Sequence, residues 1–366
     1  MPARLSDVPV VGAGVGGLSV THALRERGVD VTCFDHGAPG QGQSAGSSRV
    51  FRHHVGTPEL AALAVESRSA WQDWSERAGL PLLRQDGWVR LGGDRAADLA
   101  LLRDAGIPAT ELDPDEAVAR MPVIARPERP LLFDPLGGAT RTDATIAALV
   151  RWTEPSLREA RVLEVVADGD AVLLRTDRGE HRCARCLICA GTGTDRLAAD
   201  AGLPIAQHRR VHGRLTFRRR RGIGAPMPSW SDRSGDHGEA AYGLAPDPET
   251  YAVGIAALDA YPEGPPESED VPAGTDLREP FARIVAYVAT AFTGLDPEPV
   301  GEIVRYTTTL GRDDDAFAVR REGPIAAFAG GNLFKFAPVL GARLAAAILD
   351  EPAEVWPLGS RSVQGA

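Results

Sequence analysis

The stretch VPVVGAGVGG at residues 8–17 decides the fold of this chain. A short apolar run is followed by glycines in the order G-x-G-x-x-G. Apolar residues with the spacing of a helix continue over 18–28, and a second apolar run, VDVTCF, leads to Asp35. The order strand, glycine-rich turn, helix and strand predicts a Rossmann-type βαβ unit, and therefore an α/β protein.

Each glycine of this pattern has its own part in binding a dinucleotide. Gly12 permits the tight turn, Gly14 lets the backbone approach a pyrophosphate, and Gly17 lets the helix pack closely. The phosphates would lie at the helix N-terminus, and Asp35 would accept a hydrogen bond from a ribose hydroxyl. A glycine-rich turn without a ligand is the alternative. Asp35 by itself suits FAD and NAD equally, because both carry a free ribose 2′-hydroxyl.

Composition describes a globular, acidic protein. The chain has 366 residues, enough for two domains, and a net charge of −10. This charge disfavours nucleic acid and anionic membranes as partners. The apolar runs are too short to span a membrane, no signal peptide is predicted, and four cysteines do not make a disulfide framework. The sequence therefore predicts a cytoplasmic protein with neither a nucleic-acid nor a membrane partner.

Lysine is almost absent from the chain. Lys335 is the only lysine among 40 lysine and arginine residues. Arginine has replaced lysine everywhere else, so the exception indicates a position that needs a compact ammonium group.

Helices and strands alternate along the rest of the chain. Helices are expected at 59–78, 94–106, 114–120, 143–153, 277–292 and near 338–349, where Asp113 and Asp143 would be N-caps and Pro338 the first helical residue. Strands are expected at 87–93, within 160–189, and at 211–217, 251–257 and 301–309, with an exposed loop at 262–275.

Two clusters have simple structural interpretations. Cys183, Cys186 and Cys189 resemble half a metal site, but ligands three residues apart on a strand point to opposite faces, so buried strand cysteines are favoured and no metal is predicted. The run Arg218–Arg221, preceded by Arg209, Arg210 and Arg214, is interpreted as a solvated hairpin, because the chain is acidic.

Four segments together resemble a known family. The loop GSSRVFRHH at 46–54, the YTTT at 306–309 and the segment NLFKFAPVLGARLAAAI at 332–348 join the glycine fingerprint. They resemble FAD-dependent oxidoreductases of the D-amino-acid oxidase superfamily, in the branch of monomeric sarcosine oxidase and N-methyltryptophan oxidase. The resemblance implies FAD as the cofactor. It also implies a Rossmann-type FAD-binding domain with an inserted antiparallel-sheet substrate domain.

The implied domains are discontinuous. The FAD-binding domain would comprise 1–80, 140–208 and 312–358, the substrate domain 81–139 and 209–311, and a disordered tail 359–366. The resemblance also implies a set of cofactor-binding residues. They are Gly12, Gly14, Val15, Gly17, Asp35, His36, Ser47, Ser48, Arg49, Val162, Ala190, Gly191, Gly330, Gly331, Asn332, Leu333, Phe334 and Lys335.

The family's carboxylate clamp maps onto Arg52 and Lys335. The planar arginine fork would bind a substrate carboxylate bidentately, and the lysine would add a point charge over the flavin. Arg49 would lie under the flavin ring, and Tyr242 and Tyr306 are candidate pocket residues. The N-terminus of the last helix would face the pyrimidine end of the flavin. His53 and His54 have structural roles by default, and a place at the flavin edge is the alternative.

Three positions depart from the family pattern. Val304 stands where the family has the cysteine that attaches FAD, so a non-covalent cofactor is expected. Ala252 is aligned with the lysine that activates O₂, which leaves O₂ or another electron acceptor open. Leu333 replaces a glycine beside the cofactor, so the active site is reshaped.

The sequence thus predicts an FAD-dependent oxidoreductase that oxidises the C–N bond of an amino acid or N-alkyl amino acid, by hydride transfer to flavin N5. The partner would be a small carboxylate-bearing amine, and oligomeric state is left open. One alternative is a tailoring enzyme of specialised metabolism that cleaves an aromatic amine or an indole-derived acid. A non-catalytic flavin-binding protein is the other.

Overall fold

The computed structural model describes residues 8–224, 226–256, 276–310 and 317–351. The loop expected at 262–275 and the tail expected at 359–366 lie outside these ranges. The chain divides into two compact units. The first unit comprises Met1–Ala45, Asp143–Arg210 and Tyr306–Ala366, and the second comprises Gly46–Thr142 and Val211–Arg305. Residues 46–80, which the sequence assigns to the FAD-binding domain, therefore belong to the second compact unit.

A six-stranded sheet forms the centre of the first unit, in the order β19-β20-β13-β1-β2-β9. Its strands are β1 (Val8–Val11), β2 (Val31–Asp35), β9 (Leu157–Glu159), β13 (Cys186–Ile188), β19 (Phe317–Glu322) and β20 (Ile325–Gly330). The pairs from β20 to β9 are parallel, and β19 is antiparallel to β20. The predicted Rossmann-type α/β fold is confirmed.

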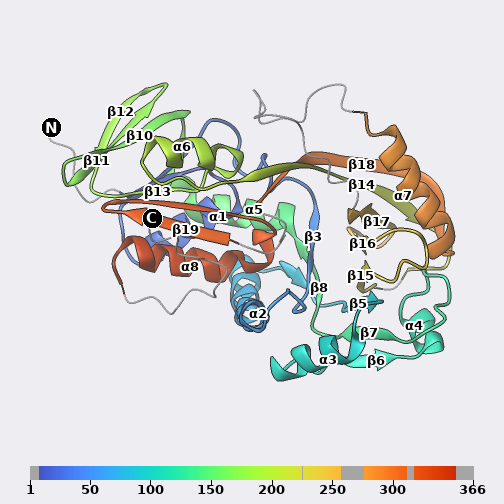
Figure 1. Ribbon diagram of the computed structural model, residues 1–366. Coiled ribbons are helices and arrows are strands. Elements are labelled where there is room, and N and C mark those ends of the chain that lie inside the picture. The colour runs from blue at the N-terminus through green and yellow to red at the C-terminus, as the bar shows by residue number, and fades with distance from the viewer. Residues whose placement is uncertain (1–7, 225, 257–275, 311–316, 352–366) are drawn as a thin grey trace. The chain divides into compact units, whose positions relative to one another are not determined.

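Helices α1 (Val15–Glu26) and α8 (Ala337–Ile348) pack against each other in the first unit (Figure 1). A Cβ at Gly341 of α8 would lie 2.7 Å from the Cβ of Ser19, so glycine permits this close approach. The remaining α-helices of this unit are α5 (Thr142–Thr153) and α6 (Thr194–Asp200) among the described residues.

Two helix starts differ from the prediction by one residue. Because α5 begins at Thr142, Asp143 lies in its first turn and is not the N-cap. Because α8 begins at Ala337, Pro338 is its second residue and not its first. Proline is tolerated at both positions, since neither amide has an intrahelical acceptor.

The predicted meander is present in the first unit. Strands β10 (Val162–Asp168), β11 (Ala171–Thr176) and β12 (Gly179–Cys183) form an antiparallel sheet. The chain then enters β13, between β1 and β20 of the central sheet. The three cysteines lie at the end of β12, the start of β13 and just after it, and all are buried.

An eight-stranded sheet dominates the second unit, in the order β18-β14-β17-β16-β15-β5-β7-β6. Its strands are β5 (Trp88–Leu91), β6 (Thr110–Leu112), β7 (Leu131–Asp134), β14 (His208–Arg219), β15 (Ser229–Asp232), β16 (Ala241–Leu244), β17 (Thr250–Ile255) and β18 (Leu295–Thr309). A small sheet in the order β3-β8-β4 contains β3 (Ser48–Phe51), β4 (Leu83–Arg84) and β8 (Gly138–Arg141).

Local capping signals fix the helices of the second unit. These helices are α2 (Pro58–Ala78), α3 (Arg95–Asp104), α4 (Pro114–Arg120) and α7 (Arg278–Ala291). Gly79 ends α2 with a φ of 72°, as its sequence indicates. The side chain of Asp113 accepts hydrogen bonds from the first-turn amides of α4, and Glu116 completes a capping box.

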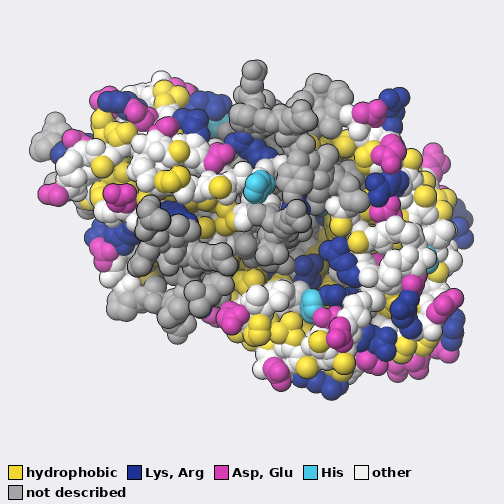
Figure 2. All heavy atoms as spheres, viewed as in Figure 1, with side chains coloured by type: hydrophobic (Ala, Val, Ile, Leu, Met, Phe, Trp, Pro, Cys, Tyr) yellow, Lys and Arg dark blue, Asp and Glu magenta, His cyan; other side chains and the backbone are white. Residues whose placement is uncertain are grey.

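Acidic and basic side chains are intermingled over the face of the molecule shown in Figure 2. None of the helices in the described ranges is long and apolar enough to cross a membrane.

Candidate active site

Four parallel strands of the first unit bring the predicted cofactor residues together. Gly12 follows β1, Asp35 ends β2, Ala190 follows β13 and Gly330 ends β20. Since parallel strands have their carboxyl ends at the same edge of a sheet, these residues share one edge. Ligands of open α/β sheets bind at this edge.

The glycine turn at this edge accepts no side chain. Gly12 has a φ of 101°, and a Cβ there would lie 2.5 Å from the carbonyl oxygen of Cys189. A Cβ on Gly17 would overlap the carbonyl oxygen of Gly12. The turn therefore presents bare backbone to a ligand, and α1 begins directly after it at Val15.

The start of α1 has the features of an anion site. Its N-cap, Gly14, has no side chain to satisfy the first-turn amides, and the Val15 amide donates to Ser44 Oγ at 2.9 Å. Positive partial charge accumulates at such a terminus. Ser44 belongs to the loop before β3, and sequence analysis missed it because the loop contains several small polar residues without a distinguishing pattern.

Asp35 fixes the turn from the neighbouring strand. Its Oδ2 accepts the Ala13 amide at 2.6 Å, and its Oδ1 accepts the Gly37 amide at 3.2 Å. His36 Nδ1 lies 3.4 Å from Oδ1. A carboxylate has about four acceptor positions, so a ribose hydroxyl can still be accommodated. The ribose contact stays a prediction.

The last strand of the sheet leads to the single lysine. After β20, Asn332 has a φ of 49° and precedes the 3₁₀ turn Leu333–Phe336. Lys335 is only 4% exposed and lies two residues before α8. Thr308 Oγ1 lies 3.4 Å from the Gly330 carbonyl and 3.2 Å from Gln43 Oε1. Gln43 was not predicted from the sequence.

Two further predicted residues flank the same sheet. Gly191 begins a 3₁₀ turn with a φ of 58°, and Val162 begins β10 and is buried. The turn at Gly12, the start of α1 and the carboxylate of Asp35 together fit a dinucleotide with a pyrophosphate and a ribose. The residues predicted in the first unit could therefore hold FAD, and their individual contacts stay predictions. Contacts from Ser47, Ser48 and Arg49, in the second unit, stay predictions.

Arg52 belongs to a hydrogen-bonded group in the second unit. Its Nε donates to the His54 carbonyl at 2.8 Å. His54 Nε2 lies 2.7 Å from Asp98 Oδ1, and Arg90 Nε lies 3.2 Å from Asp98 Oδ2. Burial and the charge of Arg90 lower the pKa of His54, against the raising effect of Asp98. The group holds the backbone that carries Arg52.

His53 is paired with an acid inside the second unit. Its Nδ1 lies 2.8 Å from Asp134 Oδ2, and neither side chain is exposed to solvent. Asp134 Oδ1 also accepts the amides of Leu136 and Gly137, both at 3.0 Å. This environment agrees with the structural interpretation of His53.

Arg49 and Tyr242 interact electrostatically in the second unit. Arg214 and Arg305 also interact with Tyr242, and both arginines interact with Arg49. Arg49 is half-buried, and burial lowers its pKa, as do the two neighbouring arginines. The Tyr242 hydroxyl lies 2.6 Å from His212 Nε2, and the two rings stack with centroids 5.5 Å apart.

The interpretation of the run Arg218–Arg221 and the arginines before it as a solvated hairpin is wrong for three of these residues. Arg210, Arg214 and Arg219 are buried, with exposures of 9%, 2% and 9%. Alternate residues of a strand share a face, so His212, Arg214 and Arg218 lie on one face of β14, where Arg214 is buried and Arg218 is exposed. Alternation therefore gave no signal for the burial of Arg214, and no local signal existed for Arg305.

The three departures from the family pattern lie on defined elements. Val304 is half-buried on β18, and Ala252 is buried on β17 opposite Thr216 and Leu244. Leu333 is half-buried in the turn that contains Lys335. Tyr306 lies on β18, and its side chain is outside the described part of the structure.

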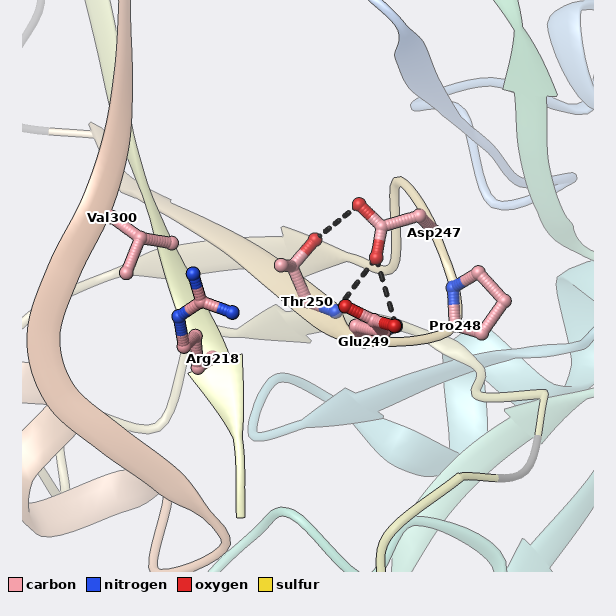
Figure 3. A pocket seen from close by; sticks show the side chains of 6 residues that line it. All are labelled: Arg218, Asp247, Pro248, Glu249, Thr250 and Val300. Atoms are coloured by element: carbon pink, nitrogen blue, oxygen red, sulfur yellow. Dashed lines mark hydrogen bonds between the residues drawn. The ribbon is translucent and has the colours of Figure 1, made fainter. Parts of the chain in front are cut away.

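A shallow surface hollow in the second unit is separate from these residues. It is lined by Arg218, Asp247, Pro248, Glu249, Thr250 and Val300 (Figure 3). Asp247 accepts the Glu249 and Thr250 amides at 2.8 Å and the Thr250 hydroxyl at 2.6 Å, so its carboxylate stabilises the turn. None of the predicted cofactor or catalytic residues lines this hollow.

Comparison with known proteins identifies the class. The family DAO, the FAD-dependent oxidoreductases, matches residues 7–347, most of the chain. The chain belongs to this family and is an FAD-dependent oxidoreductase.

Particular relatives cover nearly the whole chain. N-methyl-L-tryptophan oxidase of Citrobacter koseri is 25% identical over 356 residues, which is 92% of each chain. Human peroxisomal sarcosine oxidase is 26% identical over 363 residues, 92% of this chain and 90% of the other. Among solved structures, the open form of NikD, an unusual amino acid oxidase essential for nikkomycin biosynthesis, has a TM-score of 0.82 at 21% identity and covers 96% of this chain and 95% of its own.

Proposed function

We propose that the enzyme oxidises the C–N bond of a carboxylate-bearing amine, an amino acid or an N-alkyl amino acid. The observation that carries the proposal is Lys335, the chain's only lysine, buried beside the carboxyl edge of the parallel sheet that fits the cofactor. Two curated relatives are named for N-methyl-L-tryptophan and for sarcosine, which supports an N-methyl amino acid as the substrate class.

Lys335 and Arg52 would bind the substrate carboxylate. A buried ammonium group loses much of its hydration, so an anionic ligand would stabilise Lys335. The Nε contact of Arg52 to the His54 carbonyl fixes the plane of its guanidinium, which suits bidentate binding of a planar carboxylate. Holding the carboxylate at two points would set the orientation of the reacting C–N bond.

Bound FAD supplies a two-electron acceptor that takes a hydride at flavin N5. The chain's residues would hold the amine with the hydrogen on its α carbon directed at that acceptor. A neutral amine can lose this hydride directly, so no general base is required. The substrate would thereby become a protonated imine, which water hydrolyses to a carbonyl compound and a protonated amine. Arg49 would favour negative charge on the reduced cofactor, and Tyr242 would bound the pocket.

An anaerobic substrate screen tests the proposal. The purified yellow enzyme is mixed with amino acids, N-methyl amino acids and, as matched controls, the decarboxylated form of each amine. Loss of the oxidised flavin absorbance is expected only with carboxylate-bearing amines. Equal bleaching by the decarboxylated amines, or no bleaching by any amine, would contradict the proposal. The second result would favour a non-catalytic flavin-binding protein.

We also propose that FAD is not covalently attached. Val304 occupies the position of the family's attachment cysteine, and every cysteine in the described ranges is a buried free thiol outside β18. Acid precipitation should therefore release all of the flavin, as FAD, into the supernatant. Yellow colour retained in the protein pellet would show an attachment at another residue.

A second candidate changes the substrate class. Leu333 and Ala252 stand where the resembled family has a glycine and its second lysine, and these departures favour a different substrate, such as an aromatic amine or an indole-derived acid. A tailoring enzyme of this kind would give a ring-opened or cleaved product. Product mass spectrometry and the rate of flavin reoxidation by O₂ separate it from simple amine oxidation.

A further inference from the structure

The ring of His54 is held by three side chains of the second unit. Asp98 of α3 accepts from it, with Oδ1 2.7 Å from Nε2. Arg90 Nη1 lies 3.0 Å from Nδ1 and 3.2 Å from Nε2, and the Trp88 ring stacks on the imidazole with centroids 5.7 Å apart. Trp88 and Arg90 are alternate residues of β5 and share one of its faces. A strand and a helix therefore fix the ring together.

Arg90 is itself fixed in this place. Its Nε donates to the Gly92 carbonyl at 3.3 Å and lies 3.2 Å from Asp98 Oδ2. A Cβ at Gly93, which has a φ of 84°, would lie 2.5 Å from Arg90 Nη2, so glycine leaves the space that the guanidinium fills. Asp98 thus contacts His54 with one oxygen and Arg90 with the other. We call His54, Arg90 and Asp98 the His54 group.

The His54 group is connected to Arg52 by a hydrogen bond. Arg52 Nε donates to the His54 carbonyl at 2.8 Å. The backbone of His54 cannot change its conformation without breaking the contacts of its ring, so the acceptor of Arg52 has a fixed position. An arginine whose side chain is fixed before it binds loses less conformational entropy when it holds a ligand.

We propose that His54, Arg90 and Asp98 are positioning residues for Arg52, which tighten binding of the substrate carboxylate by fixing the Arg52 guanidinium. This inference rests on the proposed function, in which Arg52 binds that carboxylate. A pure field effect of Asp98 has the opposite sign. Removing its negative charge beside the arginines would by itself strengthen the binding of an anion. The effect of Asp98 on carboxylate affinity therefore separates positioning from charge.

The protonation of His54 gives a second contrast of the same kind. Burial lowers the pKa of His54, and the charges of Arg90 and then Arg52 act in the same direction, against Asp98. The neutral ring donates from Nε2 to Asp98 and has no proton on Nδ1, beside Arg90 Nη1. A proton added there would repel Arg90 and loosen the His54 group. Carboxylate binding should therefore weaken as the pH falls, although the added positive charge alone would strengthen it.

Binding of methoxyacetate to the holoenzyme tests the inference. This carboxylate has no amine and stays ionised over the pH range used, and the change in flavin absorbance gives its Kd. Asp98→Asn should raise the Kd about fivefold, as expected when a long side chain must be ordered on binding. Asp104→Asn makes the same charge change at an exposed position of α3 and should leave the Kd unchanged. In an Arg52→Met background, Asp98→Asn should change the Kd by less than about twofold.

The pH profile carries the test if Asp98→Asn does not fold with FAD bound. The wild-type Kd should rise about twofold or more from pH 7.5 to 5.0, as His54 gains its proton. His54→Gln keeps a donor for Asp98 and does not titrate, so its Kd should stay constant over this range.

Three results overturn the inference. They are an equal or lower Kd in Asp98→Asn, an equal effect of Asp98→Asn with and without Arg52, and the same pH profile in His54→Gln and the wild type. If Arg52→Met weakens methoxyacetate binding but Asp98→Asn does not, only this inference fails. If Arg52→Met leaves the Kd unchanged, the proposed carboxylate contact of Arg52 fails as well.

Discussion

The candidate site of the first unit is made mainly of backbone groups, whereas that of the second unit is made of side chains. In the first unit the site is largely backbone: the turn at Gly12 and Gly17 and the amides at the start of α1. In the second unit it is side chains, such as the guanidinium groups of Arg49 and Arg214 that share the Ser48 carbonyl. A backbone site needs small residues that leave the backbone accessible. A side-chain site needs charged side chains that are brought together by strands distant in the sequence. The two sites should therefore respond differently to substitution.

The largest effect is expected from Gly17→Ala in the first unit. The added methyl group would overlap the Gly12 carbonyl, and backbone cannot move aside cheaply. We expect a loss of about 3 kcal/mol in the free energy of unfolding, with loss of bound FAD. Thermal unfolding and flavin content measure both. Gly37→Ala is the control, since nothing lies within 4 Å of a Cβ there. A Gly17→Ala enzyme that keeps its FAD and its Tm would show that the backbone does not form the site.

Asp35→Ala should have an intermediate effect. It removes the acceptor of the Ala13 amide, at 2.6 Å, together with the predicted ribose contact. FAD binding should weaken by about 1–3 kcal/mol, measured as the Kd for FAD of the stripped enzyme. Asp35→Asn keeps an acceptor and should lose less. Equal FAD affinity in Asp35→Ala and the wild type would remove Asp35 from the cofactor site.

The smallest effect concerns how the free energy of unfolding depends on pH through His54 in the second unit. Burial, and then Arg90, lower the pKa of His54 below its ordinary 6.5, so the unfolded chain binds this proton more readily than the folded chain. Stability should therefore fall as the pH falls through 6.5, by at most about 1.4 kcal/mol per pH unit for one group.

His54→Gln should reduce the loss of stability between pH 7.5 and 5.5, as measured by urea unfolding at each pH. His208→Gln, at an exposed position of β14, is the control and should behave as the wild type. If His54→Gln loses as much stability as the wild type over this range, the folded state does not favour the neutral form of His54.

The sequence predicts the first unit well, because its signals are local. The spacing of glycines and apolar residues specifies β1, α1 and β2, just as the local capping residue Asp113 specifies the start of α4 in the second unit. These features depend on backbone geometry within a few residues. Gln43 and Ser44 escaped prediction because their partners, Thr308 and the Val15 amide, come from other segments.

The second unit is less predictable, because its site depends on strand pairing between distant segments. Residues 46–80 join it since β3 pairs with β8, placing Ser48 opposite Arg141. Arg214 looks like part of a solvated run until its strand neighbours are known, and Arg305 carries no local signal. Long-range pairing of this kind is not encoded by local periodicity.

A double-mutant cycle on the carboxylate clamp tests the central claim most directly. Lys335→Met and Arg52→Met are made singly and together, with Arg218→Met as control, and the half-saturating substrate concentration and bound FAD are measured for each. We expect each single change to raise that concentration at least tenfold, about 1.4 kcal/mol, with FAD retained. Because either group alone leaves the anion half-paired, the double variant should lose much less than the sum of the two. Additive losses, or an efficient substrate without a carboxylate, would contradict the clamp and the assignment that rests on it.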